Sequence, residues 1–442
     1  MTAKYKPSKH LLTIHDFPDP GKYLFFQTRT RAQVVGDDEL KSLLDASSIT
    51  ATPDREQTIK TLSRMGILIP EQTDEDQVLA DWFNTVRNKR KSLQATVLTT
   101  YGCNFACTYC IEGDDHPKID MDAQTAYRTS QYLQAKIEKY NPERAEIGFY
   151  GGEPLLNQNP FRIIVPQVRH FAEKKGIPFS FRLITNGALL TPQKTDELTQ
   201  MGLEHVKITV DGTREHHNKR RPYKNGGGTY DTVMKNIEFA AAKVKVHLGG
   251  NFDAENADSM IKLLDVLEER GLKDKLATVS FKPIADAVTD ITDKTRPGVD
   301  LRCDYADPET SRILFKLRKE TILRGFKTSP GIGTDLCSMT TNPLMIVIDP
   351  RGSLYRCPAF VGYNQFISGT IEQGEGERPP ARPLDSECRS CPYIPLCGEG
   401  CSFASFMRYG DITRRSCQIT FMEYTVKENI KLNYRLSRNR ER

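Results

Sequence analysis

The sequence predicts an α/β protein with a smaller region at each end, and three patterns carry that prediction. Residues 91–325 alternate between short apolar strands and amphipathic helices, which is typical of parallel α/β folds. Residues 1–80 mix short strands and helices. Residues 326–442 contain seven cysteines between positions 337 and 417. A chain of 442 residues suffices for these three domains, and the acidic residues 71–77 are a plausible linker.

The composition indicates a soluble globular chain. A net charge of +5 is too small to suggest nucleic acid as a partner. No apolar run approaches the ~20 residues that span a bilayer, so no membrane partner is expected. Residues 1–6 have no apolar signal core behind them. We therefore expect a cytoplasmic protein, in which thiols stay reduced and clustered cysteines bind metal.

The N-terminal residues 1–80 are predicted to form a small α+β domain. The expected elements, in order, are two strands, two helices and a strand, at Lys22–Thr28, Ala32–Val35, Glu39–Leu44, residues 52–65 and Ile67–Pro70. Asp37 or Asp38 is a candidate cap for the first helix. The order resembles a winged helix. Such a domain can bind a peptide as an added strand, or it can be a structural cap on the central domain.

The central residues 91–325 are predicted to contain six strand–helix units. The strands are expected at Ala95–Thr100, Glu146–Tyr150, Ser180–Thr185, His205–Val210, Val244–Gly249 and Thr278–Pro283. Apolar residues at helical spacing lie between them, as at Ala126, Leu133 and Ile137. In parallel folds of this kind, functional groups collect at the C-terminal ends of the strands.

A loop of three cysteines, Cys103, Cys107 and Cys110, follows the first strand directly. These cysteines, spaced C-x3-C-x2-C, supply three thiolates, whereas a structural zinc site requires four protein ligands. An iron–sulfur cluster held by three thiolates leaves one iron open. We therefore predict a reactive cluster whose coordination a second molecule completes.

Polar and glycine-rich motifs follow the next three strands. They are Gly151-Gly152-Glu153-Pro154, Thr185-Asn186-Gly187 and Val210-Asp211-Gly212, and Arg221 lies shortly after the last one. Adjacent glycines let backbone approach a ligand closely. A single motif of this kind is weak, but three at successive strand ends after the cysteine loop form a specific pattern.

This ordered pattern resembles the radical S-adenosylmethionine (radical SAM) superfamily. The resemblance implies a partial (β/α)6 TIM-like barrel over residues 91–325. It also implies a [4Fe–4S] cluster on Cys103, Cys107 and Cys110, with SAM on the open iron. The residues expected to contact SAM are Tyr109, Gly151, Gly152, Glu153, Pro154, Asn186, Asp211 and Arg221. Residues 1–80 are similar to the leader-peptide recognition domain attached to many peptide-modifying members.

The C-terminal residues 326–442 carry the remaining cysteine pattern. Cys337 and Cys357 flank Gly352, and Cys388, Cys391, Cys397, Cys401 and Cys417 follow. A zinc site is the alternative interpretation of these cysteines, because C-x2-C spacings also suit tetrahedral zinc coordination. The full pattern resembles the SPASM extension of radical SAM proteins, including a β-hairpin at residues 344–357. A helix after Cys417 is expected to pack back on the barrel.

The SPASM resemblance implies two auxiliary [4Fe–4S] clusters, and so three clusters in the chain. Cys337, Cys357 and Cys401 would hold the first auxiliary cluster. Cys388, Cys391, Cys397 and Cys417 would hold the second. The first set supplies three thiolates for four irons. The fourth iron is bound by Cys303, by Asp335 or by no residue of the protein.

The implied activity is that of a radical SAM/SPASM enzyme, a peptide maturase. Such an enzyme cleaves SAM reductively to a 5′-deoxyadenosyl radical and oxidatively modifies a ribosomally synthesised peptide, forming a thioether or a carbon–carbon crosslink. Its expected partners are a precursor peptide with a leader and a reducing protein of the flavodoxin or ferredoxin type. The alternatives are an anaerobic sulfatase-maturing enzyme, which makes formylglycine from Cys or Ser, and a non-catalytic electron carrier or scaffold. His216 and His217 are expected to be satisfied or solvated. No catalytic acid or base is identified, because no position matches a family motif for that role.

Overall fold

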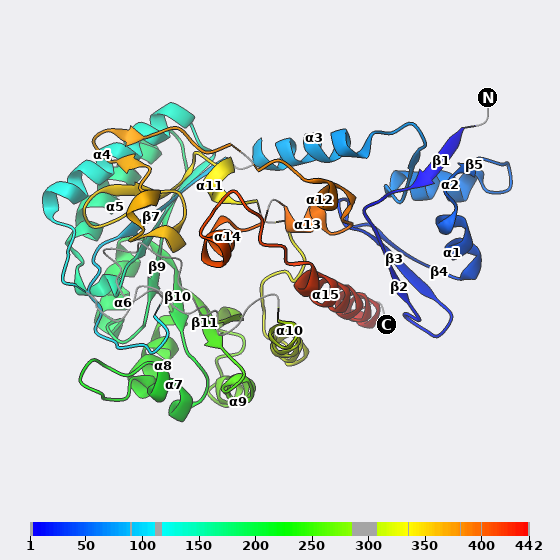
Figure 1. Cartoon of the computed structure of the whole chain (residues 1–442). Coiled ribbons are helices and arrows are strands. Elements are labelled where there is room, and N and C mark those ends of the chain that lie inside the picture. The colour runs from blue at the N-terminus through cyan, green and yellow to red at the C-terminus, as the bar shows by residue number, and fades with distance from the viewer. Residues whose placement is uncertain are drawn as a thin grey trace.

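The computed structural model describes residues 3–88, 91–110, 117–284, 307–334, 336–380, 382–398 and 400–440. Figure 1 shows an α/β layer at one end, a small N-terminal region at the other, and the C-terminal segment between them. None of the helices in the described residues is long and apolar enough to cross a membrane.

The α/β layer is built on a ten-stranded sheet in which six parallel strands follow chain order. These strands are β7 (Ser92–Leu98), β8 (Arg144–Tyr150), β9 (Phe179–Thr185), β10 (Leu203–Thr209), β11 (Lys245–Phe252) and β12 (Leu276–Pro283). Each overlaps a predicted strand, so the mostly parallel α/β fold is confirmed. The closure of this sheet into a partial barrel stays a prediction.

Helices connect successive parallel strands, as parallel pairing requires. They are α4 (Ala123–Tyr140), α5 (Asn159–Lys174), α6 (Pro192–Gln200), α7 (Arg214–Arg220), α8 (Tyr230–Ala240) and α9 (Ala257–Glu269), and α10 (Pro308–Leu323) follows the last of the six strands. Their apolar faces pack on the sheet; in α4 these residues include Ala126, Leu133 and Ile137, as predicted. Along β10 the residues alternate. Val206 and Ile208 are fully buried in this core, whereas Lys207 and Thr209 face the opposite side.

The N-terminal region contains two three-stranded sheets, with strand orders β5-β1-β6 and β2-β3-β4. Its elements are β1 (Lys4–Pro7), β2 (Leu11–His15), β3 (Tyr23–Gln27), β4 (Gln33–Gly36), α1 (Asp38–Asp45), β5 (Ile49–Thr50), α2 (Glu56–Arg64), β6 (Leu68–Pro70) and α3 (Glu75–Asn88). Asp37 caps α1 by accepting the Leu40 N–H at 3.4 Å. The predicted elements are present, but β1, β2 and β5 were not expected, because they are short and carry no strong alternation.

The C-terminal segment extends the central sheet. β13 (Met345–Ile348) pairs in parallel with β7, and β14 (Ser353–Tyr355) pairs with β13 as the predicted hairpin. Gly352 has φ +82° in the turn, a conformation that glycine adopts without strain. The remaining elements are β15 (Gly369–Thr370), β16 (Gly374–Glu375), α11 (Ser338–Thr341), α12 (Ser386–Ser390), α13 (Ile394–Cys397), α14 (Ser402–Tyr409) and α15 (Ile419–Arg440).

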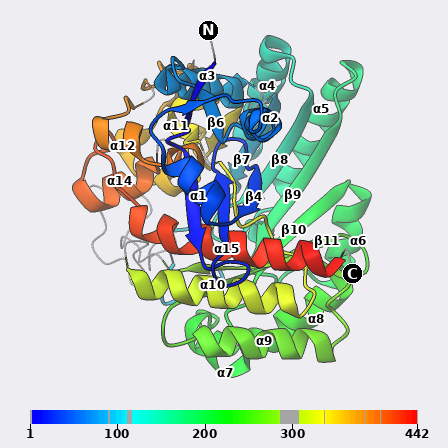
Figure 2. The same ribbon diagram turned by 90° about the vertical axis from the view of Figure 1, so that its right-hand side faces the viewer.

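Helix α15 packs on α10 of the α/β layer, in agreement with the expectation that a helix after Cys417 packs back on the central domain. It lies alongside α10 (Figure 2). Its residues Val426 and Ile430 share a hydrophobic cluster with Leu12, Leu24 and Phe26 of the N-terminal strands. Since α10 itself contacts β12, α15 connects the N-terminal sheet to the edge of the central layer.

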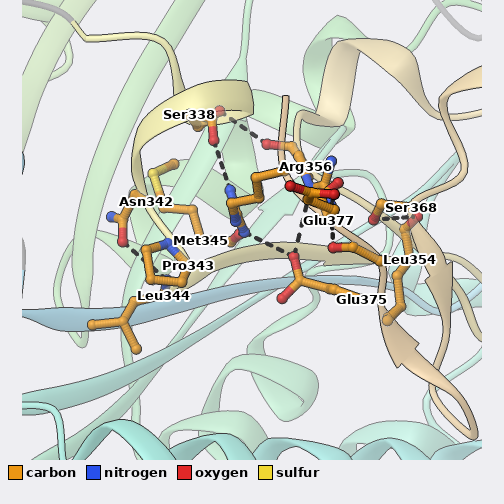
Figure 3. Close-up of polar contacts among 12 residues, drawn as sticks. Ser338, Asn342, Pro343, Leu344, Met345, Leu354, Arg356, Ser368, Glu375 and Glu377 are labelled. Carbon is orange, nitrogen blue, oxygen red and sulfur yellow. Dashed lines mark hydrogen bonds and ion pairs between the residues drawn. The ribbon is translucent and has the colours of Figure 1, made fainter. Parts of the chain in front are cut away.

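Figure 3 shows Glu375 and Arg356 in a polar network of the C-terminal segment, and Lys136 joins α4 to this buried network. Glu375 accepts from Lys136 Nζ at 2.5 Å and from Arg378 Nη2 at 2.7 Å. Arg356 Nε lies 3.8 Å from the same carboxylate. Arg378 also donates to the Ser338 carbonyl at 3.0 Å. Three cations therefore depend on one carboxylate, next to the chain that carries Cys337 and Cys357.

Candidate active site

The cysteine loop at residues 103–110 is held by main-chain hydrogen bonds to the last residue of α7 and to the chain just after it. The Ala106 N–H donates to the Pro222 carbonyl at 2.9 Å, and the Thr108 N–H donates to the Arg220 carbonyl at 3.0 Å. All three thiols are partly exposed. A loop fixed at its centre in this way presents its cysteines without needing a helix or strand of its own.

Gly151 and Gly152 let the end of β8 lie against the start of the cysteine loop. A Cβ on Gly151 would stand 2.2 Å from the Thr100 carbonyl oxygen, and one on Gly152 would stand 2.3 Å from that of Gly102. The Gly152 N–H donates to Thr100 at 3.1 Å. The close approach is therefore to the chain's own backbone, whereas the sequence argument expected an approach to a ligand. Pro154 follows and begins a buried 3-10 turn.

Glu153 is fully buried, and donors of the chain already occupy both of its carboxylate oxygens. Oε1 accepts the Leu155 N–H at 3.0 Å, and Oε2 accepts the Asn186 N–H at 2.8 Å. The Thr185 hydroxyl lies 2.8 and 2.9 Å from the two oxygens. Burial raises the pKa of Glu153 to about 7, and these hydrogen bonds oppose the rise. Glu153 therefore ties the end of β8 to the end of β9.

Asn186, after β9, contacts the cysteine loop. Its Nδ2 donates to Asn104 Oδ1 at 2.7 Å and lies 3.9 Å from Cys103 Sγ. Its Oδ1 accepts the Ala188 N–H at 3.0 Å. The predicted residues Glu153 and Asn186 thus lie in one connected set with the first cysteine.

Tyr109 and the buried pair Asp211 and Arg221 form the centre of the site. The Tyr109 hydroxyl donates to Asp211 Oδ2 and accepts from Arg221 Nη1 at 2.8 Å. Asn251, which sequence reasoning missed, donates its side-chain amide to Tyr109 at 3.1 Å and its backbone N–H to Asp211 Oδ1 at 2.7 Å. Asn251 is a polar residue near the end of β11, so the strand-end rule could have found it.

The charged side chains of this set, Asp211 and Arg221, are buried. Burial raises the pKa of the Asp211 carboxyl, and Arg221 opposes that rise from 4.0 Å. Arg221 Nε is buried and makes no hydrogen bond within the described residues. A buried, unsatisfied guanidinium N–H costs free energy, and an anionic group bound beside it would satisfy this donor. The surroundings therefore fit a ligand that carries a carboxylate.

His217 is a satisfied core residue, as expected. Its Nδ1 accepts the Asp211 N–H at 3.1 Å, so Nε2 carries the proton and faces Thr229 Oγ1 at 3.1 Å. Burial lowers the pKa of His217 well below its usual value, with Arg221 adding to the effect. The neutral ring therefore supports the backbone at Asp211. His216 lies nearer the surface, 3.3 Å from Thr213 Oγ1.

The C-terminal cysteines influence one another in the two predicted sets. Burial raises the pKa of Cys357 to about 12, and Cys401 and Cys337 add to that rise. In the other set, burial raises the pKa of Cys397 to about 11. There the contributing neighbours are Cys388, Cys391 and Cys417.

Arg382, which sequence reasoning did not single out, lies between the two sets. Its side chain is 8% exposed and donates to Ser405 Oγ and to the Gly400 carbonyl, both at 2.9 Å. Burial lowers the pKa of Arg382, and the thiols of Cys337, Cys401 and Cys397 oppose that change. No carboxylate of the described chain is close enough to pair with it, so the cysteines are its available negative partners.

The donor chemistry of all three cysteine sets suits iron–sulfur clusters. Across the described ranges, no three His, Cys, Asp or Glu side chains converge closely enough to hold one metal ion. Cys303 and Asp335, two alternatives for the fourth ligand of the first auxiliary cluster, lie outside the described residues.

Comparison with known proteins gives a consistent result. Residues 97–267 match the radical SAM superfamily. The chain is 24% identical to the mycofactocin maturase MftC of Mycolicibacterium smegmatis, over 70% of this chain and 77% of that protein. It is 23% identical to the radical SAM cyclopropyl synthase TigE of Paramaledivibacter caminithermalis, over 70% and 68%.

Two solved structures share the fold. The chain resembles anSMEcpe with bound AdoMet, with a TM-score of 0.61 and 20% identity over 78% of this chain and all of that one. It also resembles Streptococcus suis SuiB bound to the precursor peptide SuiA, with a TM-score of 0.52 and 14% identity over 94% and 99%. The match over residues 97–267, which include the cysteine loop and the strand-end residues around it, identifies a radical SAM domain in this chain, and the similarity to radical SAM maturases marks the protein as an enzyme.

Proposed function

We propose that this enzyme oxidatively modifies a ribosomally synthesised peptide by radical SAM chemistry. The observation that carries the proposal is the hydrogen-bonded set of Tyr109, Asp211 and Arg221, which links the cysteine loop to the strand ends. The maturase MftC and the cyclopropyl synthase TigE are each similar over 70% of the chain. The modification we propose is a thioether or carbon–carbon crosslink.

In this proposal Cys103, Cys107 and Cys110 hold a [4Fe–4S] cluster, and bound SAM supplies one-electron cleavage chemistry there. Arg221 offers its unsatisfied Nε to the SAM carboxylate. Asn186, Asp211 and Tyr109 line the same space, with Gly151, Gly152 and Pro154 forming its backbone wall. Because Glu153 is saturated by its own chain, we assign it the role of holding Asn186 in position.

The C-terminal domain, residues 326–442, is proposed to hold two auxiliary [4Fe–4S] clusters on the two cysteine sets named above. Their proposed role is to accept the second electron when the new bond forms in the peptide. A flavodoxin- or ferredoxin-type protein would supply the first electron. The expectation of a cytoplasmic enzyme belongs to the same proposal.

The N-terminal residues 1–80 are proposed to bind the leader of the precursor peptide. The likeness to SuiB extends over 94% of this chain, whereas the likeness to anSMEcpe extends over 78%. The larger coverage favours a peptide maturase over the alternative, an enzyme that forms formylglycine in a sulfatase. That alternative gives the N-terminal sheets no role.

The decisive experiment uses the full chain reconstituted with iron and sulfide, reduced with dithionite and incubated with SAM. We expect about twelve irons per chain for three clusters and formation of 5′-deoxyadenosine. Cys103→Ala should retain about eight irons and form none. Equal 5′-deoxyadenosine formation by wild type and Cys103→Ala would reject the proposal. Mass spectrometry after co-expression with the peptide encoded beside this gene then distinguishes a crosslink from formylglycine in a sulfatase.

A further inference from the structure

A cavity of about 410 Å³ lies where three parts of the chain meet, away from the cysteine loop. Its walls come from α10, from α15, from the loop at residues 328–333 and from the end of α13. Phe281 of β12 closes one side and Cys397 another. Its volume is within the range of ligand pockets, which favour such junctions.

The cavity contains one cation with no acidic partner. Arg318 Nε donates to Asn429 Oδ1 at 2.6 Å, and Nη1 donates to the Ser329 carbonyl at 2.5 Å. Both acceptors are neutral, and Nη2 makes no hydrogen bond within the described residues. Burial lowers the pKa of Arg318, with no acidic neighbour opposing it. A carboxylate in the cavity would supply the missing charge.

The rest of the lining is mainly apolar. Phe315 and Leu314 project from α10, and Phe421 and Met422 from α15. Gly331 closes the space over the guanidinium, since a Cβ there would stand 2.6 Å from Arg318 Nε. A fitting ligand therefore has a large apolar group next to a carboxylate.

The cavity is continuous with the packing of the N-terminal strands. Leu396 and Val426 line it, and both also belong to the hydrophobic cluster that contains Leu12 and Leu24 of β2 and β3. On the other side, the wall includes Ser280 and Phe281 of β12, in the sheet that carries the site. A peptide held by the N-terminal domain and reaching that site could pass here.

We propose that this cavity binds a segment of the peptide substrate in which a carboxylate adjoins a large apolar side chain. That the ligand is the peptide substrate rests on the proposed function. That the cavity prefers a carboxylate next to an apolar group rests on the residues that line the cavity. Arg318 binds the carboxylate, and the phenylalanine and methionine side chains enclose the apolar group.

The test measures binding of three short probes to the reconstituted full chain by calorimetry. They are N-acetyl-Glu-Phe-amide, its uncharged analogue N-acetyl-Gln-Phe-amide, and N-acetyl-Gln-Phe with a free C-terminal carboxylate. We expect at least one acidic probe to bind about tenfold more tightly than the uncharged one, a difference that one charge-assisted contact can supply. Which acidic probe binds identifies a side-chain or a chain-end carboxylate. Equal binding of all three, or none, would overturn the proposal.

Variants assign the preference to this cavity. Arg318→Met should reduce the affinity for the acidic probe to that of the uncharged probe, and Arg318→Lys should restore part of it. Arg312→Met on the exposed side of α10, where Arg312 pairs with Glu309, is the matched control. Met422→Trp should weaken all probes by filling the space. A preference for the acidic probe that survives Arg318→Met would refute the assignment.

A second readout separates this proposal from the proposed function. The same samples are assayed for 5′-deoxyadenosine without peptide, and Arg318→Met should leave its formation unchanged. If the wild type forms no 5′-deoxyadenosine, the proposed radical chemistry is rejected, but the binding data can still support the proposed cavity. Normal 5′-deoxyadenosine with no discrimination between probes would reject the cavity alone.

Discussion

The Tyr109 hydroxyl donates a hydrogen bond to Asp211, joining the cysteine loop to the end of β10 across more than one hundred residues of sequence. The same hydroxyl accepts from Arg221 at 2.8 Å. A single phenol therefore stands between a buried carboxylate and a buried guanidinium. This arrangement makes Tyr109 the residue whose loss should disturb both charges at once.

Tyr109→Phe should weaken SAM binding about tenfold, because it leaves a buried acceptor on Asp211 and a buried donor on Arg221 unpaired. Equilibrium binding of SAM to the reconstituted protein measures the effect. Iron content should match wild type, since the cysteines remain. Tyr127→Phe, at a side chain that is 49% exposed, is the control. Unchanged affinity would show that the hydroxyl does not organise the site.

Glu153 should make the stability of the protein depend on pH. Its pKa of about 7 in the folded chain is above the unfolded value of ~4.3, so the folded state binds the extra proton between these values. The contribution is fully present below about pH 4 and is lost as pH rises through 7, a change of about 4 kcal/mol. Urea unfolding from pH 4 to 8 measures it. Glu153→Gln should reduce this slope, and an identical slope in both proteins would contradict the assignment.

Lys207, on β10, should make the free energy of unfolding depend on pH in the opposite direction, so that stability falls as pH falls. Burial and its neighbours Lys282 and Arg182 lower the pKa of Lys207 to about 8, below the unfolded value of ~10.4. Its contribution is fully present above the unfolded value and is lost as pH falls through 8. At pH 7 the charge therefore costs stability, and Lys207→Met should stabilise the protein by about 1–3 kcal/mol. Urea midpoints should rise for this variant and not for the exposed control Lys245→Met. A lower midpoint would refute the idea.

Glu375→Gln should destabilise the protein strongly. Lys136 and Arg356 are each 7% exposed at the side chain and share this carboxylate with Arg378. Removing the acid leaves buried cations without a negatively charged partner, which costs about 3–5 kcal/mol. Chemical denaturation measures the loss.

The matched control for Glu375 is Glu372→Gln. Glu372 pairs with Arg128 on the surface, and both side chains are nearly half exposed. Exposed pairs of this kind contribute about 1 kcal/mol or less. Similar losses for the two variants would mean that the buried network does not depend on its acid.

Arg382→Met should lower the reduction potentials of the proposed auxiliary clusters. The buried cation lies near thiols of both sets, Cys337, Cys401 and Cys397, and a positive charge favours the reduced, more negative state of each cluster. Redox titration followed by electron paramagnetic resonance measures the shift. Arg408→Met, at an exposed arginine of α14, should change nothing. Potentials equal to wild type would show that Arg382 serves packing alone.

Much of the parallel layer was predictable, because each strand is a short apolar run and each intervening helix has an apolar face. The division of the C-terminal cysteines into two sets came from the SPASM resemblance, and the thiols that raise one another's pKa lie within those sets. The strands β1, β2 and β5 were not predictable. They are two to five residues long, and β1 and β5 pair with strands that are distant in the sequence.

The sequence alone determined the order of the strands and the residues delivered to their ends, since both follow from local apolar patterns and parallel strands end at one edge. Only the tertiary structure decided that Glu153 is saturated by its own chain, that Arg382 lies between the cysteine sets and that α15 packs on the N-terminal strands. These contacts join residues far apart in the chain. They depend on how whole elements pack together, which local patterns do not encode.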